Sequence, residues 1–174
     1  NFKSMHRPGK LLKYSASAGS GKTHALTGFY LSRILYDPGA YRRILAVTFT
    51  NAAAAEMKSR ILSRLYMLGS EPVSEEEAKA KNEFINDLCT DFPELFPDRR
   101  QAETLTLKHA PMAMKNILQD YSRFTVGTID SFFQRVIRAF AREIDLPAGY
   151  EIELEHDILL GNAVDELLYQ VSED

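Results

Sequence analysis

Residues 16–23, with the sequence ASAGSGKT, combine small side chains, a cation and a hydroxyl in a pattern that binds phosphate. Small residues allow successive backbone N–H groups to turn toward one phosphate group, and the N-terminus of a following helix adds partial positive charge. Lys22 can then reach the β- and γ-phosphate oxygens, and the Thr23 hydroxyl can bind Mg²⁺. The segment matches the pattern G-x-x-x-x-G-K-[ST], except that Ala16 replaces the first glycine. We therefore predict a site for ATP and Mg²⁺ with Lys22 as its catalytic residue, made by Ala16, Ser17, Ala18, Gly19, Ser20, Gly21, Lys22, Thr23 and His24.

Two later stretches place hydroxyls and an aromatic ring where a strand gives way to a helix: AVTFTNAAAAEMKSRIL (46–62) and VGTIDSFFQRVIRAF (126–140). Ligands of parallel sheets usually bind at the carboxyl ends of the strands. Hydroxyls and backbone N–H groups bind phosphates, and aromatic rings stack on bases. An alternative for Phe49 is a core position beside satisfied threonines. The pattern predicts contacts to single-stranded nucleic acid from Thr48, Phe49, Thr50, Asn51, Thr128, Asp130, Ser131 and Phe132.

The segments around these motifs alternate between strand and helix patterns. Strands are expected at 11–17, 44–50 and 124–129. The second run, ILAVTFT, is short, apolar and β-branched, as a central parallel strand should be. Helices are expected at 23–36, 52–68 and about 131–143, with Asn51 and Asp130 as N-caps of the second and third. This alternation predicts an α/β fold, a parallel sheet flanked by helices.

The stretch from residue 69 to residue 122 has a different pattern. SEEEAKAKNEFINDL (74–88) begins with Ser74 and a glutamate at capping-box spacing, which predicts a helix. Residues 101–121 predict one or two further helices, broken near Pro111. We interpret residues 69–122 as a helical insertion into the α/β core.

Composition and charge limit the class of protein to which this chain can belong. The chain has 174 residues, 45% of them hydrophobic, with one cysteine and no run of 18 apolar residues. No secretory signal is found, so we expect a cytoplasmic protein without a membrane segment. Residues 1–66 hold eleven Lys and Arg against two carboxylates, whereas residues 146–174 hold eight carboxylates and no Lys or Arg. This asymmetry indicates a polyanion partner for the first third, although solvated helix faces are an equal alternative.

In their order, the three stretches resemble motifs I, Ia and Ib of superfamily 1 DNA helicases of the UvrD/RecB type, with spacing closest to RecB- or AddA-like helicase–nuclease subunits. The resemblance covers about residues 10–68 and 123–160. It implies a RecA-like P-loop NTPase fold and ATP-dependent DNA helicase activity in the full-length protein, with exodeoxyribonuclease as a further activity. It also implies single-stranded DNA or DNA ends as substrate, and a RecC/AddB-like partner subunit. By resemblance, Lys22 and Thr23 serve ATP and Mg²⁺, while Thr48, Phe49, Asn51, Thr128 and Ser131 line the DNA track.

Two departures from the family pattern limit what the chain alone can do. Ala52 stands where the family usually has lysine, and no motif II with its Asp-Glu pair is found. Asp165 and Glu166 lie in a segment with helical rather than strand spacing, so they are a poor substitute. We therefore expect the 174 residues to bind ATP without hydrolysing it.

The resemblance also divides the chain into expected parts. Residues 1–4 are expected to precede a native start at Met5. Residues 5–68 and 123–145 form the RecA-like core, interrupted by the insertion at 69–122, and residues 146–174 begin a helical subdomain.

Two other functions remain open at this point. A nucleoside or small-molecule kinase could use the same phosphate loop, but it offers no reason for Phe49 and Phe132 at two strand ends. A non-catalytic module that binds a partner protein is the other alternative. Binding to oligo(dT) distinguishes the kinase, which should show none at low salt.

Overall fold

The computed structural model describes residues 22–140, 160–161 and 164, with the backbone alone for residues 22–24. The expected strand at 11–17 and the loop residues 16–21 lie outside the described residues. The chain divides into two units, Asn1–Ile129 and Asp130–Asp174.

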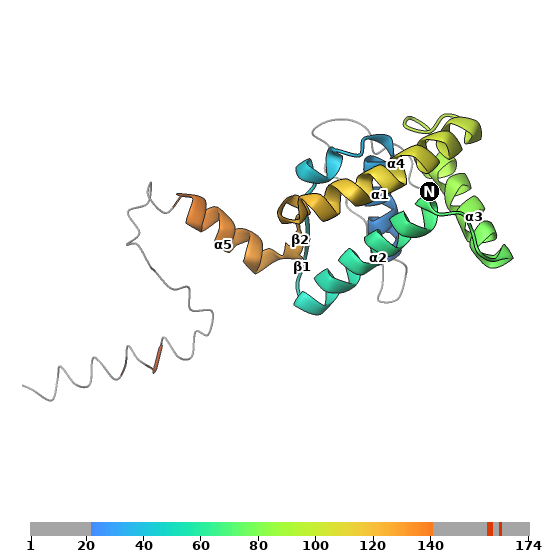
Figure 1. The fold of residues 1–174 in the computed structure, drawn as a ribbon. Coiled ribbons are helices and arrows are strands. Elements are labelled where there is room, and N and C mark those ends of the chain that lie inside the picture. The colour runs from blue at the N-terminus through green and yellow to red at the C-terminus, as the bar shows by residue number, and fades with distance from the viewer. Residues whose placement is uncertain (1–21, 141–159, 162–163, 165–174) are drawn as a thin grey trace, which may run out of the picture. The chain divides into compact units, whose positions relative to one another are not determined.

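The described part is mostly helical (Figure 1). The elements run in the order α1 (Lys22–Tyr36), η1 (Ala40–Arg43), β1 (Ala46–Thr48), α2 (Asn51–Gly69), α3 (Glu75–Asp91), α4 (Arg99–Gln119), η2 (Tyr121–Arg123), β2 (Val126–Thr128) and α5 (Ile129–Phe140). The expected helices at 23–36 and 74–88 are confirmed, while the expected strands at 44–50 and 124–129 are shorter than predicted. No helix in the described part of the chain has the length and apolar character needed to cross a bilayer.

β1 and β2 form a two-stranded parallel sheet. Ala46 pairs with Val126 and Thr48 pairs with Thr128, so each pair joins residues 80 positions apart. The helices α2, α3 and α4 all lie between the two strands in sequence. The prediction of parallel strands joined through helices is confirmed for this pair.

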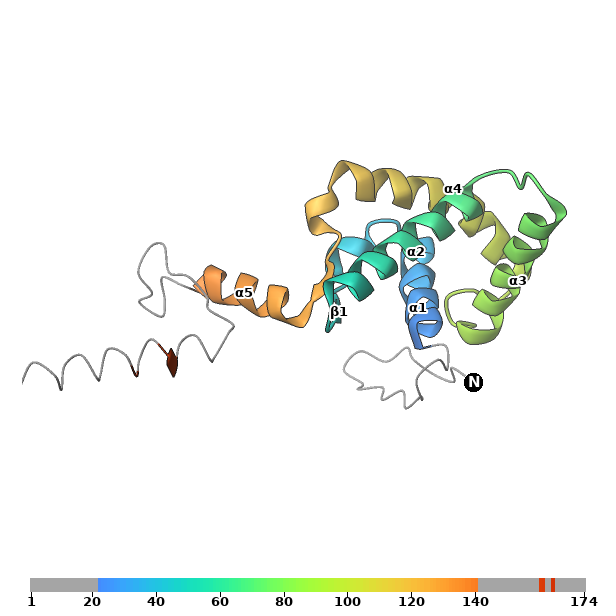
Figure 2. The same cartoon turned by 90° about the horizontal axis from the view of Figure 1, so that it is seen from below.

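The core of the first unit lies among α1, α2, α3 and α4, and α4 packs against each of the other three (Figure 2). α1 buries one side of its surface through Tyr30, Leu31, Ile34 and Leu35. The segment interpreted as an insertion contributes a large share of the core, through Phe84, Ile85, Leu88, Phe92, Leu95, Phe96, Ala102, Ala110, Ala113 and Ile117. These helices therefore stabilise the elements that carry the motifs.

The N-cap of α2 differs from the prediction. Thr50, not Asn51, is the cap: its backbone is extended and its hydroxyl accepts a hydrogen bond from the N–H of Ala53 at 3.2 Å. Threonine caps helices in this way because its oxygen satisfies one of the free N–H groups of the first turn. Asn51 is instead the first helical residue. The predicted Ser74 cap of α3 is confirmed, and its hydroxyl accepts from the N–H of Glu77.

The predicted break at Pro111 is wrong, because α4 continues through this residue as one helix. Proline inside a helix removes one backbone hydrogen bond and clashes with the preceding turn, at a cost of about 3 kcal/mol or more. Here the proline ring packs against the end of α2: a methyl group added at Gly69 would lie 2.9 Å from Pro111 Cγ. The buried stripe that α4 presents to α1 and α2 offsets the cost.

α5 begins at Ile129, two residues before the predicted start, so Asp130 lies inside its first turn rather than at its cap. None of its residues is buried. In the second unit, residues 160, 161 and 164 are also helical, in agreement with the helical spacing expected there.

Candidate nucleic-acid interface

The carboxyl ends of β1 and β2 bring two of the predicted stretches together. Because the strands are parallel and Thr48 pairs with Thr128, both strands end at the same edge of the sheet. Thr48 is half-buried and Thr128 is buried and engaged in an interaction. Phe49 and Ile129, which directly follow the two strands, therefore leave the sheet at a common edge.

Phe49 follows β1 directly and 85% of its side chain is exposed. The alternative of a core phenylalanine is therefore wrong. The Phe49 ring is not part of the core cluster. Because apolar surface stabilises a fold only when it is buried, this exposed ring contributes little to folding stability. A free ring face at a strand end is the feature that stacking on a nucleic-acid base requires.

Polar groups at the start of α2 adjoin this ring. Thr50 and Asn51 are both exposed, and the Thr50 hydroxyl is already used as the helix cap. The first turn of α2 contains no acidic residue. The positive end of the helix dipole is therefore not neutralised locally, and it suits an anionic group.

The third stretch continues from β2 into α5. Asp130 is exposed, while Ser131 and Phe132 are half-buried. The ring of Phe132 lies 5.6 Å from that of Phe133, edge to face. Ser131 has an interaction partner. These residues belong to the second unit, and their role in DNA binding stays a prediction.

The predicted nucleotide site is described only at its helical end. α1 spans Lys22–Tyr36, in agreement with the helix expected at 23–36, and its first turn contains no acidic residue that would repel phosphate. The residues 16–21, and the side chains of Lys22, Thr23 and His24, lie outside the described part. Among the described residues, no group of three or more His, Cys, Asp or Glu side chains could hold a metal ion.

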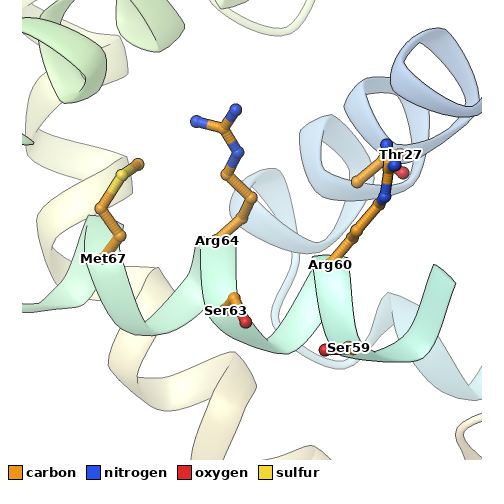
Figure 3. Close-up of a pocket in the computed structure, with 6 residues that line it drawn as sticks. All are labelled: Thr27, Ser59, Arg60, Ser63, Arg64 and Met67. Carbon is orange, nitrogen blue, oxygen red and sulfur yellow. The ribbon is translucent and has the colours of Figure 1, made fainter. Parts of the chain in front are cut away.

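A groove of about 410 Å³ lies between α1 and α2 (Figure 3). Thr27 comes from α1, and all the other lining residues come from one face of α2: Ser59, Arg60, Ser63, Arg64 and Met67. Figure 3 shows Arg60 extending toward Thr27 and Arg64 extending away from its helix. The sequence by itself identifies this segment only as a basic helix. The sequence feature that marks the groove is the four-residue spacing of Arg60 and Arg64 and of Ser59 and Ser63, which places all four on one helix face.

The family model for the UvrD/REP helicase N-terminal domain matches residues 2–174. The chain belongs to this family. The UvrD/RecB resemblance inferred from the three motifs is thereby confirmed, and the match favours the helicase interpretation over the kinase alternative. A UvrD/REP N-terminal domain is compatible with the parallel pair β1–β2 and with the helix that begins at Lys22.

Known relatives of this UvrD/REP domain include proteins named as ATP-dependent helicase/nuclease subunits. The chain is 31% identical to the one from Geobacillus kaustophilus over 171 residues, which covers 96% of this chain and 11% of the relative. It is 31% identical to the one from Bacillus pumilus, covering 91% of this chain and 10% of the relative. The chain therefore spans about a tenth of the length of these relatives. No solved structure gives a significant match to it.

Proposed function

We propose that this chain is the ATP-binding N-terminal part of an AddA- or RecB-like DNA helicase–nuclease, active in the cytoplasm in DNA repair. In this proposal residues 16–24 bind ATP and Mg²⁺ on a RecA-like core. Thr48, Phe49, Thr50, Asn51, Thr128, Asp130, Ser131 and Phe132 contact single-stranded DNA. A RecC/AddB-like subunit is the proposed partner of the full-length protein.

The observation that carries the proposal is the exposed ring of Phe49 at the shared edge of two parallel strands. A base can stack on this ring, and stacking is tolerant of sequence because every base has a π-face. The positive end of the α2 dipole, which no acidic residue neutralises, and the polar side chain of Asn51 suit the adjacent phosphate. Binding of this kind needs no base-specific contact and fits a motor that moves along any strand.

The position of Lys22 and Thr23 at the start of α1 supports ATP binding. The helix dipole and the lysine cation both favour the phosphates, and Thr23 would hold Mg²⁺ together with phosphate oxygens. Bound Mg²⁺ would neutralise charge on the β- and γ-phosphates. The 174 residues offer no carboxylate pair in a motif II context to complete the metal site.

The test is binding of a labelled oligo(dT) to Phe49→Ala, measured by fluorescence anisotropy at low salt. Loss of one stacked base should reduce the affinity by about 1–3 kcal/mol. The free energy of unfolding should change little, because the ring is exposed. A Phe49→Ala protein that binds oligo(dT) as tightly as the wild type would contradict the proposed DNA track.

Val73→Ala is the matched control. Val73 is also an exposed apolar side chain, at 88%, but it precedes α3 and is not part of the strand ends. Its removal should change neither oligo(dT) affinity nor stability. A similar loss of affinity in both variants would indicate a nonspecific surface effect.

A further inference from the structure

The groove between α1 and α2 has no role in the proposed contacts at the strand ends. It combines two guanidinium groups, those of Arg60 and Arg64, with the hydroxyl side chains of Ser59, Ser63 and Thr27. At about 410 Å³ it falls within the size range of small-ligand sites, roughly 300–1,000 Å³. Its two cations and the exposed hydroxyls of Ser59 and Ser63 are donors suited to an oxyanion.

The charges in the groove are incompletely compensated. Arg60 Nη2 lies 2.6 Å from Glu56 Oε1, in an exposed ion pair one helical turn apart. Solvent screens such an exposed pair, so a phosphate can compete for the guanidinium. Arg64 is half-buried, and no carboxylate of the described residues forms an ion pair with it. The groove thus carries a net positive charge.

Arginine and serine side chains together suit a phosphate group. A guanidinium presents a planar fork of donors that matches two phosphate oxygens, and hydroxyls donate to the others. The four-residue spacing on α2 places Arg60 one turn before Arg64, and Ser59 one turn before Ser63, on the same helix face. One phosphate group could therefore be held by donors from two successive turns.

The groove lies within reach of both predicted sites. Arg60 is nine residues after the start of α2, or about 14 Å along the helix axis from the exposed Phe49 region. Thr27 is five residues after Lys22, or about 7.5 Å along α1. A strand that passes Phe49 or a nucleotide held at Lys22 could each supply the phosphate.

We propose that the α1–α2 groove is a phosphate-binding site in which Arg60 and Arg64 hold a phosphate group of a nucleic-acid strand or of a nucleotide. The inference rests on the proposed function only for the source of the phosphate. The Glu56 carboxylate competes with the phosphate for Arg60. Removing this carboxylate therefore strengthens binding, and removing Arg64 weakens it.

The experiment compares Arg64→Ala, Glu56→Gln and Arg43→Ala in the 174-residue chain. Arg43 is the matched control: it is exposed and paired with Asp37 at 2.6 Å on η1, away from the groove. The first probe is labelled (dT)16, titrated by anisotropy between 50 and 200 mM NaCl. The second is sodium pyrophosphate, titrated by calorimetry. Far-UV circular dichroism checks that each variant retains its helix content.

With a nucleic-acid phosphate in the groove, Arg64→Ala should weaken (dT)16 binding about five- to tenfold at 50 mM salt. It should also lower the magnitude of the salt slope by about 0.7, which is one phosphate contact to a single strand. Glu56→Gln should strengthen binding, a gain that misfolding cannot produce, and Arg43→Ala should match the wild type.

The remaining outcomes separate this inference from the proposed function. If the wild type binds (dT)16 and neither Arg64→Ala nor Glu56→Gln changes its affinity for (dT)16 or for pyrophosphate, the groove proposal is overturned while the DNA track stays in place. Pyrophosphate binding weakened by Arg64→Ala, without any (dT)16 binding, would support the groove with a nucleotide as its source and contradict the DNA track. A wild-type chain that binds neither probe overturns both.

Discussion

Lys22 is the first residue of α1, and a lysine cation and a helix N-terminus both favour bound phosphate. We expect the wild-type chain to bind Mg·ATP weakly, because the phosphate contacts act without the contacts that a second domain would add. Lys22→Ala should abolish this binding, as measured by isothermal calorimetry. Lys79→Ala, which removes an exposed lysine of α3, should leave it unchanged. Equal nucleotide affinity in Lys22→Ala would contradict the phosphate-loop assignment.

The buried hydroxyl of Tyr30 should make the stability of the protein depend on pH. This hydroxyl is buried without a hydrogen-bond partner among the described residues, and burial, followed by the neighbouring Tyr41, raises its pKa above 10.0. Below pH 10 both folded and unfolded states keep this proton. Above pH 10 only the unfolded state releases it, so stability falls by up to about 1.4 kcal/mol per pH unit.

Tyr30→Phe should therefore be more stable than the wild type by about 1 kcal/mol at pH 7, since a buried unsatisfied hydroxyl is removed. Its advantage should grow between pH 10 and 11. Urea unfolding at pH 7, 10 and 11 measures both effects. Tyr66→Phe, at a tyrosine that is 64% exposed, is the control for removing a hydroxyl that is not buried. An advantage of Tyr30→Phe that is constant with pH would contradict the raised pKa.

At the scale of elements, local sequence patterns predicted the positions of the helices. Tertiary packing determined features that these patterns do not show, such as the continuity of α4 and the exposure of Phe49. The Ser74 cap and the apolar spacing of α1 are short-range features, so the sequence alone predicts them. The continuity of α4 through Pro111 depends on Gly69, which is 42 positions earlier and accommodates the proline ring. No local pattern carries this information. Likewise, apolar spacing alone could not decide whether Phe49 is exposed or part of the core.

The two helical glycines of α1 and α2 should respond oppositely to alanine. A methyl group at Gly69 would lie 2.9 Å and 3.0 Å from two carbons of the Pro111 ring, so Gly69→Ala should destabilise by about 1–3 kcal/mol. A methyl group at Gly28 meets nothing within 4 Å, and Gly28→Ala should stabilise by about 0.5–1 kcal/mol. Chemical denaturation measures both. A neutral Gly69→Ala would show that α2 and α4 can separate at this point without cost.

At the scale of the whole molecule, we expect the 174-residue chain to hydrolyse no ATP at a meaningful rate, with or without DNA. Phosphoryl transfer to water needs a metal held from two sides, a positioned water and a cation on the transferring group, and each missing part costs orders of magnitude. A phosphate-release assay with and without oligo(dT) checks this. DNA-stimulated hydrolysis that disappears in Lys22→Ala would instead place a catalytic carboxylate within the chain, with Asp165 and Glu166 as the first candidates.

The parallel pairing of β1 with β2 has a consequence for synthesis on the ribosome. Ala46 cannot pair with Val126 until 80 further residues have been synthesised. At about 5–20 residues per second, the wait is about 4–16 s. During this interval the side of β1 that later pairs with β2 is open to pairing with another nascent chain. Because α2, α3 and α4 emerge first and make contacts closer in sequence, their helical pack can assemble before the sheet closes. Polysomes that translate this chain should therefore be most prone to aggregation after residue 48 and before residue 126 has left the exit tunnel.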